Sequence, residues 1–152
     1  MEDLKKFNAS LIKILTRLGP EFSDCKAISF MTKVEVRNGR IADVSFSDSA
    51  DSTLVAILTG QFKNTDTISL LNYSNKLNRN QVVFMMPISY NVITRDCSNP
   101  AIDYKTLSLR NRFKGKVFSG DCVLLEPNGL NILVQDDFHT PRQRKKKGTR
   151  NY

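Results

Sequence analysis

An Asn38-Gly39 dipeptide separates two stretches rich in apolar residues, and it constrains the fold more than any other feature of the chain. Both residues accept positive φ angles, which a two-residue type I′ hairpin turn requires. Before the turn, every second residue shares one face, and that face holds Ile28, Phe30, Thr32, Val34 and Val36. We therefore predict a β-hairpin with strands at 28–36 and 41–47, in which Val36 lies opposite Ile41.

The second strand of this hairpin does not alternate strictly. Uninterrupted alternation from Ile41 places Asp43 in the core and turns Val44 and Phe46 outward, which desolvates a carboxylate and exposes two apolar side chains. One extra residue, a β-bulge near Ala42 and Asp43, corrects the phase. The spacing predicts that Ile41, Val44 and Phe46 all face the core.

One helix is predicted before the hairpin in the sequence and another after it. Residues 3–18 form an amphipathic helix that ends at Gly19-Pro20; its apolar stripe is Leu4, Phe7, Leu11, Ile14, Leu15 and Leu18. The basic opposite face also fits a helix on a membrane surface, but packing across a sheet gives the same pattern. A second helix at 52–63 follows three cap candidates, Ser49, Asp51 and Ser52, and its buried side is Leu54, Ile57, Leu58 and Phe62.

Two segments follow the second helix. Thr65 to Asn80 is polar and rich in Asn, and we interpret it as a long connection. Residues 82–93 are β-prone and apolar on both faces, which predicts a strand that is covered on both sides or that pairs with a partner. Pro87, which lacks an N–H, favours an edge position or a bulge. An apolar edge strand offers a surface for strand addition by a partner, and here that surface is Val82, Phe84, Met86, Ile88 and Tyr90.

The last third of the chain is less regular. We expect a loop or short polar helix around 104–113, and a second hairpin over 116–134 that turns at Glu126-Pro127-Asn128-Gly129. The fold class is therefore α+β, with a small antiparallel sheet. Residues 1–135 form one domain, and residues 136–152 are a disordered basic tail.

The net charge of +8 is concentrated in that tail. Six cations without an acidic residue lie in the last eleven positions, so the rest of the chain carries only +2, eight less six; these candidate phosphate contacts are Arg142, Arg144, Lys145, Lys146, Lys147 and Arg150. Clustered Lys and Arg bind nucleic acid through its phosphates. A nucleic-acid-associated protein that uses this tail is therefore the alternative function.

No catalytic or metal-binding pattern is recognisable. The three cysteines, Cys25, Cys97 and Cys122, include no Cys-x-x-Cys pair; one disulfide is allowed, and at least one thiol stays free. The only histidine, His139, stands with Asp136 and Asp137 beside the tail, where a preorganised site is not expected. Asp48, Asp51 and Ser52 lack the spacing of a calcium-binding loop, and helix capping explains them more simply. We predict no enzyme activity, no cofactor and no metal.

The run from Phe30 to Tyr90 resembles the carboxy-terminal domain of TonB and the small TonB-like proteins of bacterial envelopes. The shared pattern is a strand, an Asn-Gly turn, the Ile41, Val44 and Phe46 spacing, a Ser-rich cap, a helix, and a strand around Pro87. The Tyr-Pro pair that commonly precedes the first strand in that family is missing, as are a membrane anchor and a proline-rich spacer. No run of residues is long and apolar enough to cross a bilayer.

The resemblance implies a non-catalytic protein-interaction domain whose partner is another protein or a second copy of the chain. It also implies the periplasm or cell envelope if a leader is removed before Met1; otherwise the protein is cytoplasmic.

Overall fold

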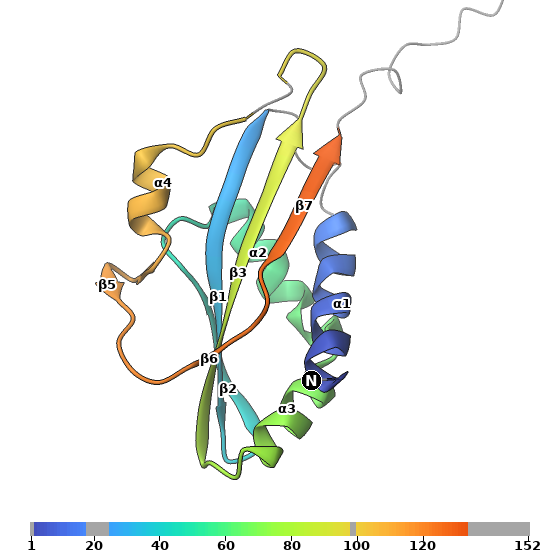
Figure 1. Cartoon of the computed structure of the whole chain (residues 1–152), viewed down its shortest axis with the longest axis vertical. Helices are drawn as coiled ribbons and strands as arrows, with labels where there is room; N and C mark the ends of the chain where they lie inside the picture. The colour runs from blue at the N-terminus through green and yellow to red at the C-terminus, as the bar shows by residue number, and fades with distance from the viewer. Residues whose placement is uncertain (1, 18–24, 98–99, 134–152) are drawn as a thin grey trace, which may run out of the picture.

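In the computed structural model, which describes residues 2–17, 25–97 and 100–133, helices lie on both sides of a five-stranded mixed sheet (Figure 1). The sheet consists of β1 (Lys26–Arg37), β2 (Arg40–Phe46), β3 (Gln81–Ile93), β6 (Val123–Leu124) and β7 (Asn128–Leu133). One side carries α1 (Glu2–Arg17), α2 (Ser52–Gln61) with the short helix Phe62–Asn64, and α3 (Thr67–Lys76). The other side carries α4 (Tyr104–Leu109), β4 (Arg112–Phe113) and β5 (Lys116–Val117). The predicted α+β class is confirmed.

The hairpin of β1 and β2 has the predicted turn and the predicted bulge. Asn38 and Gly39 adopt φ angles of 52° and 74°, and Val36 pairs with Ile41. Glu35 pairs with Asp43 and Val34 with Val44, so Ala42 is the extra residue. The apolar side chains of β2, Ile41, Val44 and Phe46, pack against the core as predicted.

The predicted helices at 3–18 and 52–63 are confirmed. Helix α1 buries Phe7, Leu11, Ile14 and Leu15; Leu18 and the Gly19-Pro20 stop lie outside the described residues. Asp51 is the cap of α2, because its Oδ1 accepts hydrogen bonds from the backbone N–H groups of Thr53 (2.9 Å) and Leu54 (3.3 Å). Leu54 and Leu58 are buried, while Ile57 and Phe62 pack at the margin of the core.

Helix α3 replaces the long connection expected over 65–80, so that interpretation was wrong. Asp66 caps the helix by accepting from the N–H of Ser69 (3.1 Å), and its own N–H donates to Ser10 Oγ of α1 (2.8 Å). Lys76 Nζ donates to Asp3 Oδ2 (2.6 Å), and this hydrogen bond lowers the pKa of Asp3. The buried positions of α3 are Ser69, Leu70 and Ser74, and helix α1 packs beside it.

Strand β3 lies inside the sheet, so the predicted edge position was wrong. It pairs antiparallel with β1 along its length, and its other side pairs in parallel with β6 at Phe84 and Met85 and with β7 from Ile88 onward. Met85 O accepts from Leu125 N (2.8 Å), and alternate backbone groups of a strand point to the same side. The nitrogen of Pro87 therefore points into the break between β6 and β7, where no N–H is required.

The second hairpin predicted over 116–134 is also absent. Its expected strands, β6 and β7, do not pair with each other; they follow one another along the same side of β3. Parallel pairing requires the chain to return across the sheet between β3 and β6. We call residues 100–122, which connect β3 to β6, the crossover segment; it contains α4, β4 and β5. Helix α4 packs against β1.

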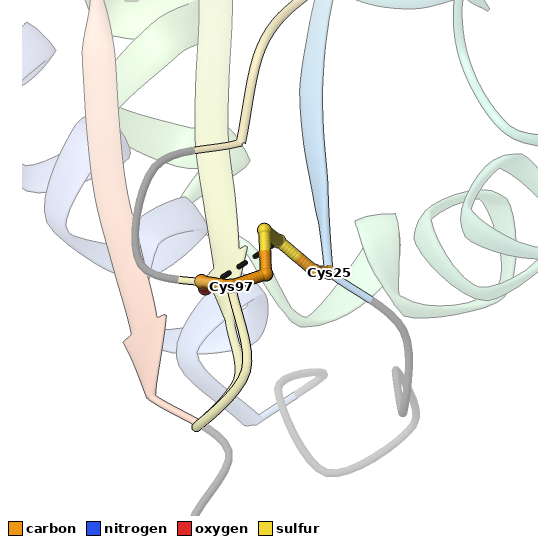
Figure 2. The surroundings of a disulfide bond; sticks show 2 residues. All are labelled: Cys25 and Cys97. Carbon is orange, nitrogen blue, oxygen red and sulfur yellow. Dashed lines mark hydrogen bonds between the residues drawn. A yellow bond between two sulfur atoms is a disulfide. The ribbon is translucent and has the colours of Figure 1, made fainter.

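A disulfide joins Cys25, immediately before β1, to Cys97, beyond the end of β3 (Figure 2). The two Cα atoms are 5.9 Å apart, within the usual range for a disulfide. Thr94 and Cys97 also exchange backbone hydrogen bonds of 3.2 Å, which close the turn that carries the second sulfur. Cys122 is free and exposed. Among the described helices, none has the length and apolar character needed to span a bilayer.

Candidate functional site

Four of the five side chains of the predicted strand-addition surface are part of the core. Val82, Phe84, Met86 and Ile88 are at most 4% exposed and pack among the side chains of α1, α2 and α3; position 90 pairs with Ile28 in the sheet. The side chains of Val82, Phe84, Met86 and Ile88 are therefore not available to a partner. Strand addition to this sheet has to use an outer strand, which is β2 on one side and β6 or β7 on the other. Strand β6 has only two residues, so β2 and β7 are the longer edges.

Edge strand β2 carries features that protect edge strands from pairing with other chains. The bulge at Ala42 interrupts its ladder, and Arg40 and Asp43 place exposed charges along it. Bulges and charged side chains are common means of preventing unwanted strand addition. We therefore regard β2 as a blocked edge.

Edge strand β7 lacks these protections. Its six residues, Asn128–Leu133, include no charge and no proline, and its register with β3 runs without a shift. Among the described strands it pairs only with β3, which leaves its outer backbone groups without a strand partner. Figure 1 shows β7 beside β3 at the margin of the sheet, and the strand order places it across β3 from β1 and β2. This open margin is the candidate site for a polypeptide partner.

The crossover segment forms a second candidate surface. Between Tyr104 and Gly120 the chain has five basic residues and no acidic one: Lys105, Arg110, Arg112, Lys114 and Lys116. Three large apolar side chains in the same stretch are half or more exposed: Tyr104 (86%), Leu107 (50%) and Val117 (60%). We call these eight residues the crossover face.

A single carboxylate holds the β4-β5 turn in place. Asp48 lies between β2 and α2, and its two side-chain oxygens accept from the backbone N–H groups of Lys114 (2.8 Å) and Gly115 (2.7 Å). Its own N–H donates to Arg112 O (2.7 Å). Lys114 and Gly115 adopt φ angles of 51° and 79°, and positive φ is uncommon for a residue such as Lys. Asp48 therefore fixes a turn whose conformation is otherwise costly; the helix-capping role assigned to it from sequence was wrong.

Replacement of Asp48 by Ala is expected to loosen this turn selectively. Because both hydrogen bonds to the carboxylate disappear, amide exchange at Lys114 and Gly115 should accelerate about tenfold or more. Asp48→Asn is the matched control, since it keeps one acceptor oxygen and should give an intermediate rate. Hydrogen-exchange NMR measures both variants, and unchanged rates in Asp48→Ala would contradict the assigned role.

Two aromatic rings attach the crossover segment to the sheet. Lys33 points to the face of β1 opposite α1, α2 and α3, and its Nζ lies 4.9 Å from the ring centroid of Phe113 and 5.8 Å from that of Phe118. At the other end, Asp103 caps α4 by accepting from the N–H of Thr106 (2.6 Å), and this hydrogen bond lowers the pKa of Asp103. The crossover face is thus presented on a segment that is anchored at several points.

A cleft of about 530 Å³ lies between this segment and the sheet. Its charged lining consists of Lys33, Glu35, Arg79 and Asp121, which have no net charge together, and exposed Cys122 also borders it. Glu35 already accepts from Gln81 Nε2 (2.7 Å) and pairs with Arg37. Within the described ranges, no three His, Cys, Asp or Glu side chains come close enough together to hold a metal ion.

The predicted phosphate contacts from Arg142 to Arg150, together with His139, lie outside the described residues. The important residues that sequence reasoning missed are Asp48 and the cations of the crossover segment. The Lys and Arg residues between 105 and 116 indicate a basic surface in the sequence. The cations of the tail are more closely spaced, so the tail was predicted as the phosphate-binding segment instead. Comparisons with protein-family models, with curated proteins and with solved structures give no match to this chain.

Proposed function

We propose that this protein is a non-catalytic, TonB-like interaction domain that binds an extended, uncharged segment of a polypeptide by strand addition to β7. The observation that carries the proposal is the contrast between the two edges of the sheet. Edge β2 has a bulge and charged side chains, whereas β7 has regular pairing, no charge and no proline.

The chemistry of β7 suits an extended partner. Unpaired N–H and C=O groups along an edge form main-chain hydrogen bonds with an added strand, each contributing about 0.5–1.5 kcal/mol net. Over a strand of six residues this gives modest affinity that a second contact can strengthen. The disulfide supports an oxidising compartment such as the periplasm, because such bonds persist there and are rare in the cytosol.

The first test uses a second copy of the chain as the partner, because two β7 edges can pair across a two-fold axis. Analytical ultracentrifugation from about 10 μM to about 1 mM should reveal a reversible dimer in the affinity range expected of so short a strand. A synthetic peptide with the sequence of residues 128–133 should compete with dimer formation.

Two matched variants identify the edge. Asn131→Lys places a charge on exposed β7 and should abolish the association, while Ala42→Lys places the same charge on exposed β2 and should leave it unchanged. A chain that stays monomeric and does not bind the peptide overturns the proposal. Equal loss of association in both variants would also overturn it, because the effect would then come from charge alone.

A further inference from the structure

We propose that the crossover face docks on an anionic lipid surface, where its cations bind lipid phosphates and its three exposed apolar side chains enter the boundary between headgroups and acyl chains. This inference is independent of strand addition at β7, because it involves a different element.

The charge distribution supports a negatively charged partner. Outside residues 104–120, the described part of the chain holds twelve basic and eleven acidic residues, which nearly balance. Within 104–120 there are five basic residues and no acidic one. Lys105, Arg112, Lys114 and Lys116 are exposed, so their charges are available to a surface. A cluster of this size attracts anionic headgroups, and each cation near the surface adds to the attraction.

The apolar side chains distinguish a lipid partner from other polyanions. Tyr104 and Leu107 are three residues apart on α4 and therefore lie on the same side of that helix. Val117 pairs with Arg112 across β4 and β5, which places an exposed apolar group next to a cation. A nucleic acid would satisfy the cations and could stack on Tyr104, but it offers nothing apolar to Leu107 and Val117. A lipid surface offers both phosphates and acyl chains.

The crossover face is also preorganised for binding. Asp48 fixes the β4-β5 turn, the rings of Phe113 and Phe118 lie against Lys33, and Asp103 caps α4. Little conformational entropy is therefore lost when the face meets a membrane. Isolated exposed apolar residues are ordinary on protein surfaces, but three of them among five cations on an anchored segment form a coherent interfacial site.

Vesicle flotation of the full chain tests the proposal. Vesicles of phosphatidylcholine with about one quarter phosphatidylglycerol should bind the protein, and pure phosphatidylcholine vesicles should bind it much more weakly. The Leu107→Ser/Val117→Ser variant keeps every charge, including those of the tail, and should partition about tenfold more weakly. The Lys114→Ser/Lys116→Ser variant should also lose about tenfold or more.

The matched control removes two apolar side chains from outside the crossover face that are more exposed than Leu107 and Val117. Ile68 and Leu124 are 70% and 65% exposed, so Ile68→Ser/Leu124→Ser should fold and should bind vesicles as the unmodified protein does. Circular dichroism of each variant checks that it is folded before its vesicle binding is compared.

Three outcomes overturn the proposal. The first is that the protein does not bind anionic vesicles. The second is that Leu107→Ser/Val117→Ser binds as tightly as the unmodified chain, which assigns binding to charge alone. The third is that the control Ile68→Ser/Leu124→Ser loses as much affinity as Leu107→Ser/Val117→Ser. Mixed-sequence single-stranded RNA is the comparison ligand. If RNA binds more tightly than vesicles and only the lysine variant weakens it, the crossover face is a nucleic-acid surface instead.

Discussion

Removal of the disulfide between Cys25 and Cys97 is expected to lower the free energy of unfolding by about 4 kcal/mol. The bond closes a loop with a sequence separation of 72, so it restricts a large part of the unfolded chain. In the folded state it joins the start of β1 to the turn beyond β3, two strands that are already paired. The native state therefore loses few contacts when the bond is removed, and most of the effect arises in the unfolded chain.

The measurement is urea denaturation of Cys25→Ser/Cys97→Ser beside the unmodified protein. Cys122→Ser is the control, because this thiol is exposed and unpaired and its replacement should change stability little. Thiol titration of the unfolded protein should find one free thiol without reductant and three after reduction. Three free thiols without reductant, or an unchanged unfolding midpoint in the double variant, would show that the bond does not stabilise the protein.

The parts of the fold that sequence predicted are those encoded by neighbouring residues. The dipeptide Asn38-Gly39 is sufficient to predict the turn. The spacing of Ile41, Val44 and Phe46 predicts the bulge, because strict alternation of side chains along β2 would expose apolar surface. Helix α3 was missed for an equally local reason. Two of its buried residues, Ser69 and Ser74, are polar, so the apolar period of a packed helix is hidden in the sequence.

The parts that sequence could not predict depend on pairings between distant segments. Pro87 indicated an edge or a bulge, but the structure accommodates it at the break between β6 and β7, which only the parallel pairing of β3 creates. Asp48 shows the same limit at the candidate site, because its partners Lys114 and Gly115 are 66 and 67 residues away. A pattern within a short window does not reveal that the crossover segment folds back onto the sheet.

Deletion of Ser45 is expected to lower the free energy of unfolding by about 3 kcal/mol, whereas deletion of Ala42 should change it by no more than about 1 kcal/mol. Ala42 is the unmatched residue of the bulge, and its neighbours already pair with Val36 and Glu35. Its removal converts the bulge into a continuous ladder in which Ile41, Val44 and Phe46 keep their faces.

Deletion of Ser45 has the opposite consequence. Phe46 moves into an outward position and loses its contact with Phe30, whose ring centroid is 6.1 Å away. Ser47 is displaced as well, and its two hydrogen bonds with Met31, at 2.9 Å and 2.8 Å, are lost. No placement of the bulge restores all three apolar side chains of β2 to the core, so the loss cannot be repaired by a register shift.

The two deletions remove one residue each from the same strand, so chain length and composition are closely matched. Urea denaturation gives both stabilities, and amide exchange of β1 and β2 reports whether the hairpin remains paired. Equal stabilities for the two variants, or an unfolded protein after deletion of Ala42, would mean that the phase of β2 does not determine which side chains are buried. The hairpin would then be held by its turn alone, and the spacing after Asn38-Gly39 would carry no information about the fold.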